Sequence, residues 1–118
     1  MPSESDVLTV ATTVHGEDRA VVAVNGELDA DTAVVLRHQL AALVTQGRRY
    51  IVLDLALVPF MDSSGLNSLL RARSEMQRYE GRLLLAAPTA AVRRLLDLTG
   101  ISLTIPLHET TDLALAAI

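Results

Sequence analysis

The sequence predicts an α/β or α+β fold, built as one layered domain around a mixed β-sheet. Its length of 118 residues is that of one domain, residues 1–118. Short β-branched runs alternate with helical stretches along most of the chain, which is typical of parallel strands joined by crossover helices. The first two runs have only a turn between them, so they pair most simply as an antiparallel hairpin at one edge of the sheet.

The hairpin is predicted from residues 8–24. Apolar and polar residues alternate from Leu8 to Val14, the period-2 pattern of a half-buried strand. Residues 16–18 supply a turn, and the β-branched run of residues 20–24 is the second strand. The first six residues are expected to be a flexible tail.

The first helix follows Asn25-Gly26. Its apolar residues recur at spacings of three and four, and they are Ala33, Leu36, Leu40, Leu43 and Val44. Asp29, Asp31 or Thr32 can cap its start, and Gly47 closes it.

A central strand and a second helix come next. Residues 50–55 are apolar on both faces except at Asp54, which indicates a strand covered on both sides. Pro59 prevents a simple continuation of this strand. The second helix begins near Ser63-Ser64, ends at Gly81 and is expected to bury Leu66, Leu69, Leu70 and Met76.

The pattern then repeats to the end of the chain. We predict a strand at residues 82–87 and a helix from the cap Thr89 to Gly100, burying Val92, Leu95 and Leu96. A short strand is expected at residues 101–105. A last helix, capped near Thr110 or Thr111, carries Leu113, Ala117 and Ile118.

Composition excludes several classes of function. The ten basic residues are all arginine and are scattered in a chain of net charge −4, so no basic stripe indicates direct nucleic-acid binding. Cysteine is absent, which excludes disulfides and thiolate chemistry. The start of the chain is acidic, and no apolar stretch approaches the ~18 residues of a membrane span. We therefore expect a cytoplasmic protein that does not contact a membrane.

Motifs for enzymatic chemistry are also absent from the sequence. There is no lysine for a phosphate-binding P-loop, and the glycines do not have the spacing of a dinucleotide site. His108-Glu109 is only half of a zinc-protease motif, and His15 and His38 are read as surface residues. Neither Ser63 nor Ser64 has the glycine context of a hydrolase nucleophile. We expect no catalytic residue, no metal and no cofactor.

One segment, residues 58–66, combines an apolar run with Asp62, Ser63 and Ser64 at a strand-to-helix junction. It is read first as a helix cap, which contributes about 1 kcal/mol. Its second reading is a phosphorylation switch. An exposed serine at a helix start would place a phosphate against free backbone amides and the positive end of the helix dipole. The added charge of about −1.5 to −2, next to Asp62, would then prevent binding of a partner without unfolding the domain.

The same segment resembles a known family. Phe60-Met61-Asp62-Ser63-Ser64-Gly65-Leu66 is similar to the signature of the STAS domain, and closely to bacterial anti-sigma factor antagonists. Three further matches follow in the family's order: Gly26-Glu27-Leu28-Asp29, Ile51-Val52-Leu53-Asp54-Leu55 and Arg94-Leu95-Leu96-Asp97-Leu98-Thr99-Gly100-Ile101. The resemblance implies a STAS-like mixed sheet of four to five strands, with about four helices packed mainly on one face.

The resemblance also implies a mechanism. Family members bind an anti-sigma factor that is a serine kinase, release the sigma factor for transcription, and lose binding when the kinase phosphorylates the first serine of the motif. That serine is Ser63, and a serine phosphatase would restore the active form. The partner-binding residues implied are Asp29, Asp62, Ser64, Gly65, Leu66, Gly26 and Glu27. Of these, Ser64 is expected to complete the cap, and Gly65 to permit close backbone approach.

Two alternatives stay open at this point. Asn67 stands where antagonists often carry a second glycine, which favours a constitutive STAS scaffold or a subunit of a sensory or transport assembly. Nucleotide binding has been proposed for relatives, and here it would depend on helix N-terminal amides alone.

Overall fold

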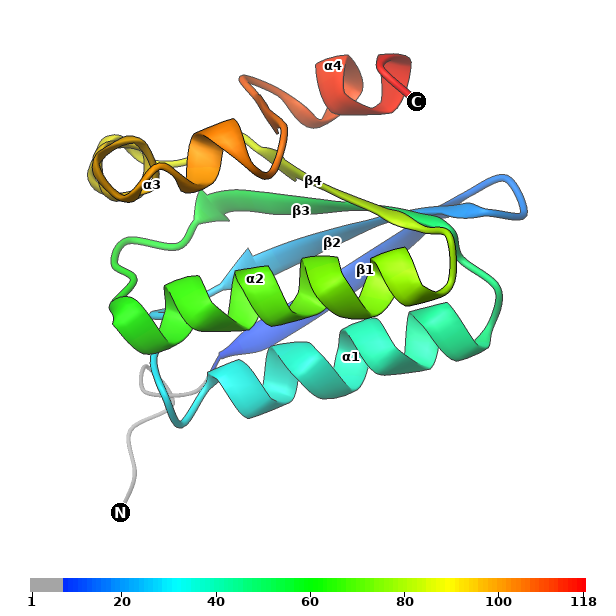
Figure 1. The fold of residues 1–118 in the computed structure, drawn as a ribbon, viewed down its shortest axis with the longest axis horizontal. Coiled ribbons are helices and arrows are strands. Elements are labelled where there is room, and N and C mark those ends of the chain that lie inside the picture. The colour runs from blue at the N-terminus through cyan, green and yellow to red at the C-terminus, as the bar shows by residue number, and fades with distance from the viewer. Residues whose placement is uncertain (1–7) are drawn as a thin grey trace.

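The sheet has five strands that lie side by side in their order along the chain. The computed structural model describes residues 8–118, so the expected tail at residues 1–6 lies outside the described residues. The strands are β1 (Thr9–His15), β2 (Arg19–Asn25), β3 (Tyr50–Leu57), β4 (Arg82–Ala86) and β5 (Leu107–His108). β1 pairs antiparallel with β2, and every later pair is parallel (Figure 1). The predicted hairpin and the mixed sheet are therefore confirmed.

Four α-helices connect these strands or follow them within residues 8–118. They are α1 (Ala33–Thr45), α2 (Ser63–Arg78), α3 (Ala90–Thr99) and α4 (Thr111–Ala116). Side chains of α1, α2 and α3 join one core cluster with the sheet, whereas Ala114 of α4 packs in a second, smaller cluster on the opposite face (Figure 1). The helices thus lie mainly on one face, as expected.

The two faces of the central strands are explained by the alternation of side chains along a strand. Side chains facing α1 and α2 alternate with side chains facing α4. The first group includes Val22, Leu53 and Leu85, and the second Val21, Val52 and Leu84. Both groups are buried, which confirms the prediction that β3 is a central strand covered on both sides.

The prediction of a strand at residues 101–105 is wrong. Ile101–Leu103 form a short 3₁₀ helix, held by hydrogen bonds from the N–H groups of Leu103 and Thr104 to carbonyls three residues earlier. Ile101 and Ile105 are buried, whereas Leu103 between them is 92% exposed. The burial period is therefore four residues, and the strand comes later, at β5.

The predicted helix caps at the C-terminal end of the chain are confirmed. Thr89 accepts a hydrogen bond from the N–H of Val92, and Thr110 accepts one from the N–H of Leu113. In α4 the residue that reaches the core is Ala114, while Leu113 is 54% exposed. Within residues 8–118, no helix combines the length and the apolar character that a membrane crossing requires.

Candidate functional site

The two acidic sequence motifs, Gly26–Asp29 and Phe60–Leu66, are in contact at one end of the sheet. The loop after β2 and the loop after β3 pair through a single parallel bridge between Leu28 and Met61. The N–H of Leu28 donates to Phe60 O at 3.1 Å, and the N–H of Asp62 donates to Leu28 O at 3.3 Å. Both loops leave the carboxyl ends of parallel strands, where open α/β sheets usually bind ligands. We call the surface formed by Glu27, Asp29, Asp62, Ser63 and Ser64 the switch surface.

The loop after β2 owes its path to Gly26 and Thr32. Gly26 has φ 126°, a backbone conformation that L side chains rarely adopt, and its N–H donates to Leu57 O at 3.1 Å. The buried hydroxyl of Thr32 donates to Glu27 O at 2.8 Å and accepts from the N–H of Asp29 at 2.9 Å. The loop is therefore held from both of its ends.

Asp29 caps the turn that leads into α1. Its Oδ1 accepts hydrogen bonds from the N–H groups of Asp31 and Thr32, each at 3.0 Å. The backbone N–H of Thr32 makes the largest contribution to lowering the pKa of Asp29 below its ordinary value of 3.8. Of the three caps considered from the sequence, Asp29 is the one whose side chain accepts from the amides just before α1, whereas Thr32 accepts from the N–H of Asp29 in the preceding loop.

The lowered pKa makes the contribution of Asp29 to stability depend on pH. Because the folded state favours the carboxylate, this stabilisation is complete above the ordinary pKa of 3.8 and is lost as pH falls through the lower, folded-state pKa. We expect the stability difference between the parent and Asp29→Asn to be largest at neutral pH and to shrink as the pH falls below 3.8. Urea unfolding at several pH values measures it, and Asp31→Asn is the control. A difference that grows with acidification would contradict this account.

The start of α2 is capped by Asp62. Its Oδ1 accepts from the N–H groups of Ser64 at 2.9 Å and Gly65 at 3.1 Å, and its carbonyl accepts from the N–H of Leu66. The expectation that the Ser64 side chain completes the cap is wrong, because the acidic side chain one residue before the helix takes that place. Ser64 contributes only its backbone N–H to the cap.

The amides expected to be free for a phosphate are partly occupied. Those of Ser64 and Gly65 already bind the Asp62 carboxylate. A phosphate on Ser63, which is exposed as the first residue of α2, would have to compete with that carboxylate for these donors. The nucleotide hypothesis is weakened for the same reason, since it depended on these amides alone.

Gly65 and Leu66 lie beneath the switch surface. Both are buried, and a β-carbon at position 65 would lie 2.5 Å from Leu28 O and 2.6 Å from Met61 Cγ. The expected close approach of the backbone at Gly65 is confirmed. Glycine is therefore required here for α2 to pack against the loop after β2.

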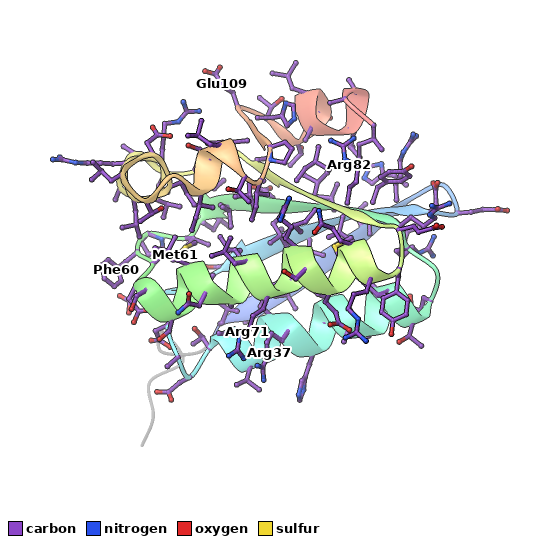
Figure 2. All side chains as sticks on the ribbon, in the orientation of Figure 1. Arg37, Phe60, Met61, Arg71, Arg82 and Glu109 are labelled. Atoms are coloured by element: carbon purple, nitrogen blue, oxygen red, sulfur yellow. The ribbon has the colours of Figure 1, made fainter. Side chains whose placement is uncertain are left out.

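Two exposed apolar side chains beside the switch surface were not identified as site residues from the sequence. Leu57, the last residue of β3, is 59% exposed. Phe60, in the loop that leads to Asp62, is 53% exposed (Figure 2). Exposed apolar side chains next to polar ones are common at protein–protein interfaces. The only sequence signal was that the chain's single phenylalanine lies within the motif.

A third loop supports the same region. The Thr89 hydroxyl, at the start of α3, donates to Val58 O at 3.0 Å. The loops after β2, β3 and β4 are therefore linked by hydrogen bonds. Within residues 8–118, no group of three or more His, Asp and Glu side chains is placed to hold a metal ion.

Comparisons with known proteins agree with this geometry. The family model described as the STAS domain matches residues 9–114. The chain is similar to the anti-sigma-F factor antagonist RsfB of Mycobacterium tuberculosis, with 31% identity, covering 98% of this chain and 93% of RsfB. It is also similar to the crystal structure of an anti-sigma factor antagonist from Mycobacterium paratuberculosis. That likeness has a TM-score of 0.85 and 32% identity, and covers 100% of this chain and 98% of the other.

A more distant likeness concerns the fold alone. The structure of the Bacillus protein SpoIIAA in its phosphorylated form has a TM-score of 0.71 and 23% identity, and the match covers 92% of this chain and 98% of SpoIIAA.

Proposed function

This chain belongs to the STAS domain family, and from that premise we propose that it is an anti-sigma factor antagonist switched off by phosphorylation of Ser63. Its partner is an anti-sigma factor with serine kinase activity, and a serine phosphatase reverses the modification. The observation that carries the proposal is the position of Ser63. It is exposed, begins α2, and follows the Asp62 carboxylate directly.

The chemistry of the switch surface supports this role. Three carboxylates, those of Glu27, Asp29 and Asp62, come from two loops that are bonded to each other through Leu28. A partner that covers this surface has to supply cationic or hydrogen-bond donor groups. A phosphate on Ser63 adds about −1.5 to −2 charge and cannot use the amides that Asp62 holds. The modification therefore changes the surface that the partner meets and leaves the core untouched.

Printed names of relatives support the same proposal. RsfB and the Mycobacterium paratuberculosis protein are both named anti-sigma factor antagonists. The fold neighbour SpoIIAA has been solved in an unphosphorylated and in a phosphorylated form, so this fold accommodates both states.

We expect Ser63→Asp to weaken binding of the partner roughly 100-fold, because a like charge is placed against a desolvated interface. Parent, Ser63→Ala and Ser63→Asp proteins serve as separate baits in a lysate of the source cell. A small ATP-binding kinase should be recovered with the parent and Ser63→Ala only. Mass spectrometry after incubation of that kinase and ATP with the parent should find phosphate on Ser63.

A matched control separates the effect of a negative charge at position 63 from a general effect of added negative charge. Gln77→Glu adds one negative charge at an exposed position near the other end of α2, and it should recover the same proteins as the parent. If all baits, including Ser63→Asp, recover the same partner, the phosphate switch is wrong. The constitutive scaffold reading, motivated by Asn67, then takes its place.

A further inference from the structure

A groove of about 790 Å³ lies between α1 and α2, and none of the residues that line it belongs to the switch surface. Its apolar lining includes Leu40, Ala41, Val44, Leu70 and Met76. A smaller hollow of about 240 Å³ shares Arg37, Asn67 and Arg71 with the groove and extends to Ser64. The two hollows therefore form one continuous surface along the helix pair.

The charges that line this groove are opposite to those of the whole chain. Arg37, Arg71 and Arg78 line it, and Glu75 is its single acidic residue. Glu75 approaches Arg78 at 3.5 Å, which leaves Arg37 of α1 and Arg71 of α2 in the same part of the groove (Figure 2). Neither guanidinium forms an ion pair with a carboxylate of residues 8–118. The groove is thus locally positive in a chain of net charge −4.

An apolar side chain is also exposed to solvent on this side of α1. Val34, which lines the smaller hollow, is 41% exposed, although valine in a helix usually faces the core. Together with the apolar lining of the groove, it favours a ligand that has apolar side chains of its own.

We propose that this groove binds an acidic amphipathic segment of a protein partner, independently of the charge state of Ser63. Apolar side chains of the segment would cover the lining between α1 and α2, and carboxylates would bind the guanidiniums of Arg37 and Arg71, which suit planar, bidentate contacts. An apolar lining does not suit a nucleic-acid backbone, and the net negative charge disfavours an anionic membrane. Charge complementarity and apolar lining together select an acidic amphipathic segment.

Two synthetic helical peptides test the proposal without knowledge of the natural partner. The probe has leucines along one face with glutamates beside them, and the counter-probe has lysines in place of the glutamates. Fluorescence anisotropy with the full chain should detect binding roughly tenfold tighter for the glutamate peptide than for the lysine peptide. The preference should weaken as salt is raised, because these ion pairs are open to solvent.

A charge-reversal variant tests whether the glutamate peptide binds in the groove. In the double variant Arg37→Glu/Arg71→Glu, the glutamate peptide should bind at least about tenfold more weakly. The matched control Arg93→Glu/Arg94→Glu makes the same change of charge at exposed positions on α3, and it should bind as the parent does. Circular dichroism of both variants establishes that they are folded. Ser63→Asp should bind the peptide as tightly as the parent.

Several results would overturn the proposal. These are absence of glutamate-peptide binding at millimolar concentration, equal binding of the two peptides, or a loss in the α3 control as large as that in the groove variant. Tighter binding of a single-stranded oligonucleotide or of phosphatidylglycerol vesicles than of the peptide would also overturn it. Because none of these measurements uses the kinase, failure of the Ser63 switch and failure of the groove are separate outcomes.

Discussion

Gly65→Ala is expected to destabilise the protein by about 3 kcal/mol, although alanine is the better helix former. Position 65 lies in the first turn of α2, where a β-carbon would be 2.5 Å from the carbonyl oxygen of Leu28. That oxygen belongs to backbone and also accepts from the N–H of Asp62, so it cannot move away without loss of a hydrogen bond. Relief of the overlap requires α2 to shift from the loop after β2.

Urea unfolding of the Gly65→Ala variant measures this cost. The matched control is Asn67→Ala, two residues further along the same helix at an exposed position, and it should change stability by less than about 0.5 kcal/mol. If Gly65→Ala is as stable as the parent, the contact between α2 and Leu28 is looser than the structure indicates. The Gly65 variant should also bind the proposed partner more weakly, since the two loops of the switch surface would separate.

Leu28→Ala is expected to cost about 3 kcal/mol as well, by a different mechanism. The side chain is fully buried in the main core cluster, and its backbone joins the two loops of the switch surface. Truncation leaves a cavity directly beneath Asp29 and Asp62. The loss has two contributions. One is the transfer free energy of the removed side-chain carbons, and the other is the dispersion energy of the contacts that the cavity walls no longer make.

The control for Leu28→Ala is Leu57→Ala, which removes the same atoms from a side chain that is 59% exposed at the end of β3. It should change the free energy of unfolding by less than about 0.5 kcal/mol. Equal losses in the two variants would mean that Leu28 is no better packed than its exposed neighbour. If Leu57→Ala leaves stability nearly unchanged, as expected, any loss of partner binding in this variant reports on contact with the partner and not on stability.

Elements with a strong period and a clear cap were predictable from the sequence. α1 and α2 begin within a residue of the predicted positions, because apolar side chains repeat at helical spacing and polar caps precede them. The strand predicted at residues 101–105 failed for an identifiable reason. Ile101, Leu103 and Ile105 alternate like strand residues, yet only the first and the last are buried, on one side of a helical turn. Three apolar residues cannot distinguish these two periods.

The candidate site was only partly predictable. The motif containing Asp62 and Ser63 indicated a helix start, but not which side chain would take the amides, because Asp, Ser and Thr are all good caps. The groove lined by Arg37 and Arg71 depends on how α1 and α2 pack against each other. The hydrophobic pattern of α1 did not reveal this, since Val34 and Val35 reach solvent despite being apolar.

The sequential order of the strands has a consequence for how the chain folds during synthesis. Each strand pairs with the one that precedes it in the chain, so every new strand finds its neighbour already made as the polypeptide leaves the ribosome. Loop closure is limited to one crossover at a time, which keeps its entropy cost low. The loops that carry Asp29 and Ser63 can meet once β3 and the start of α2 have emerged. The surface proposed to bind the partner can therefore form before β5 pairs with β4.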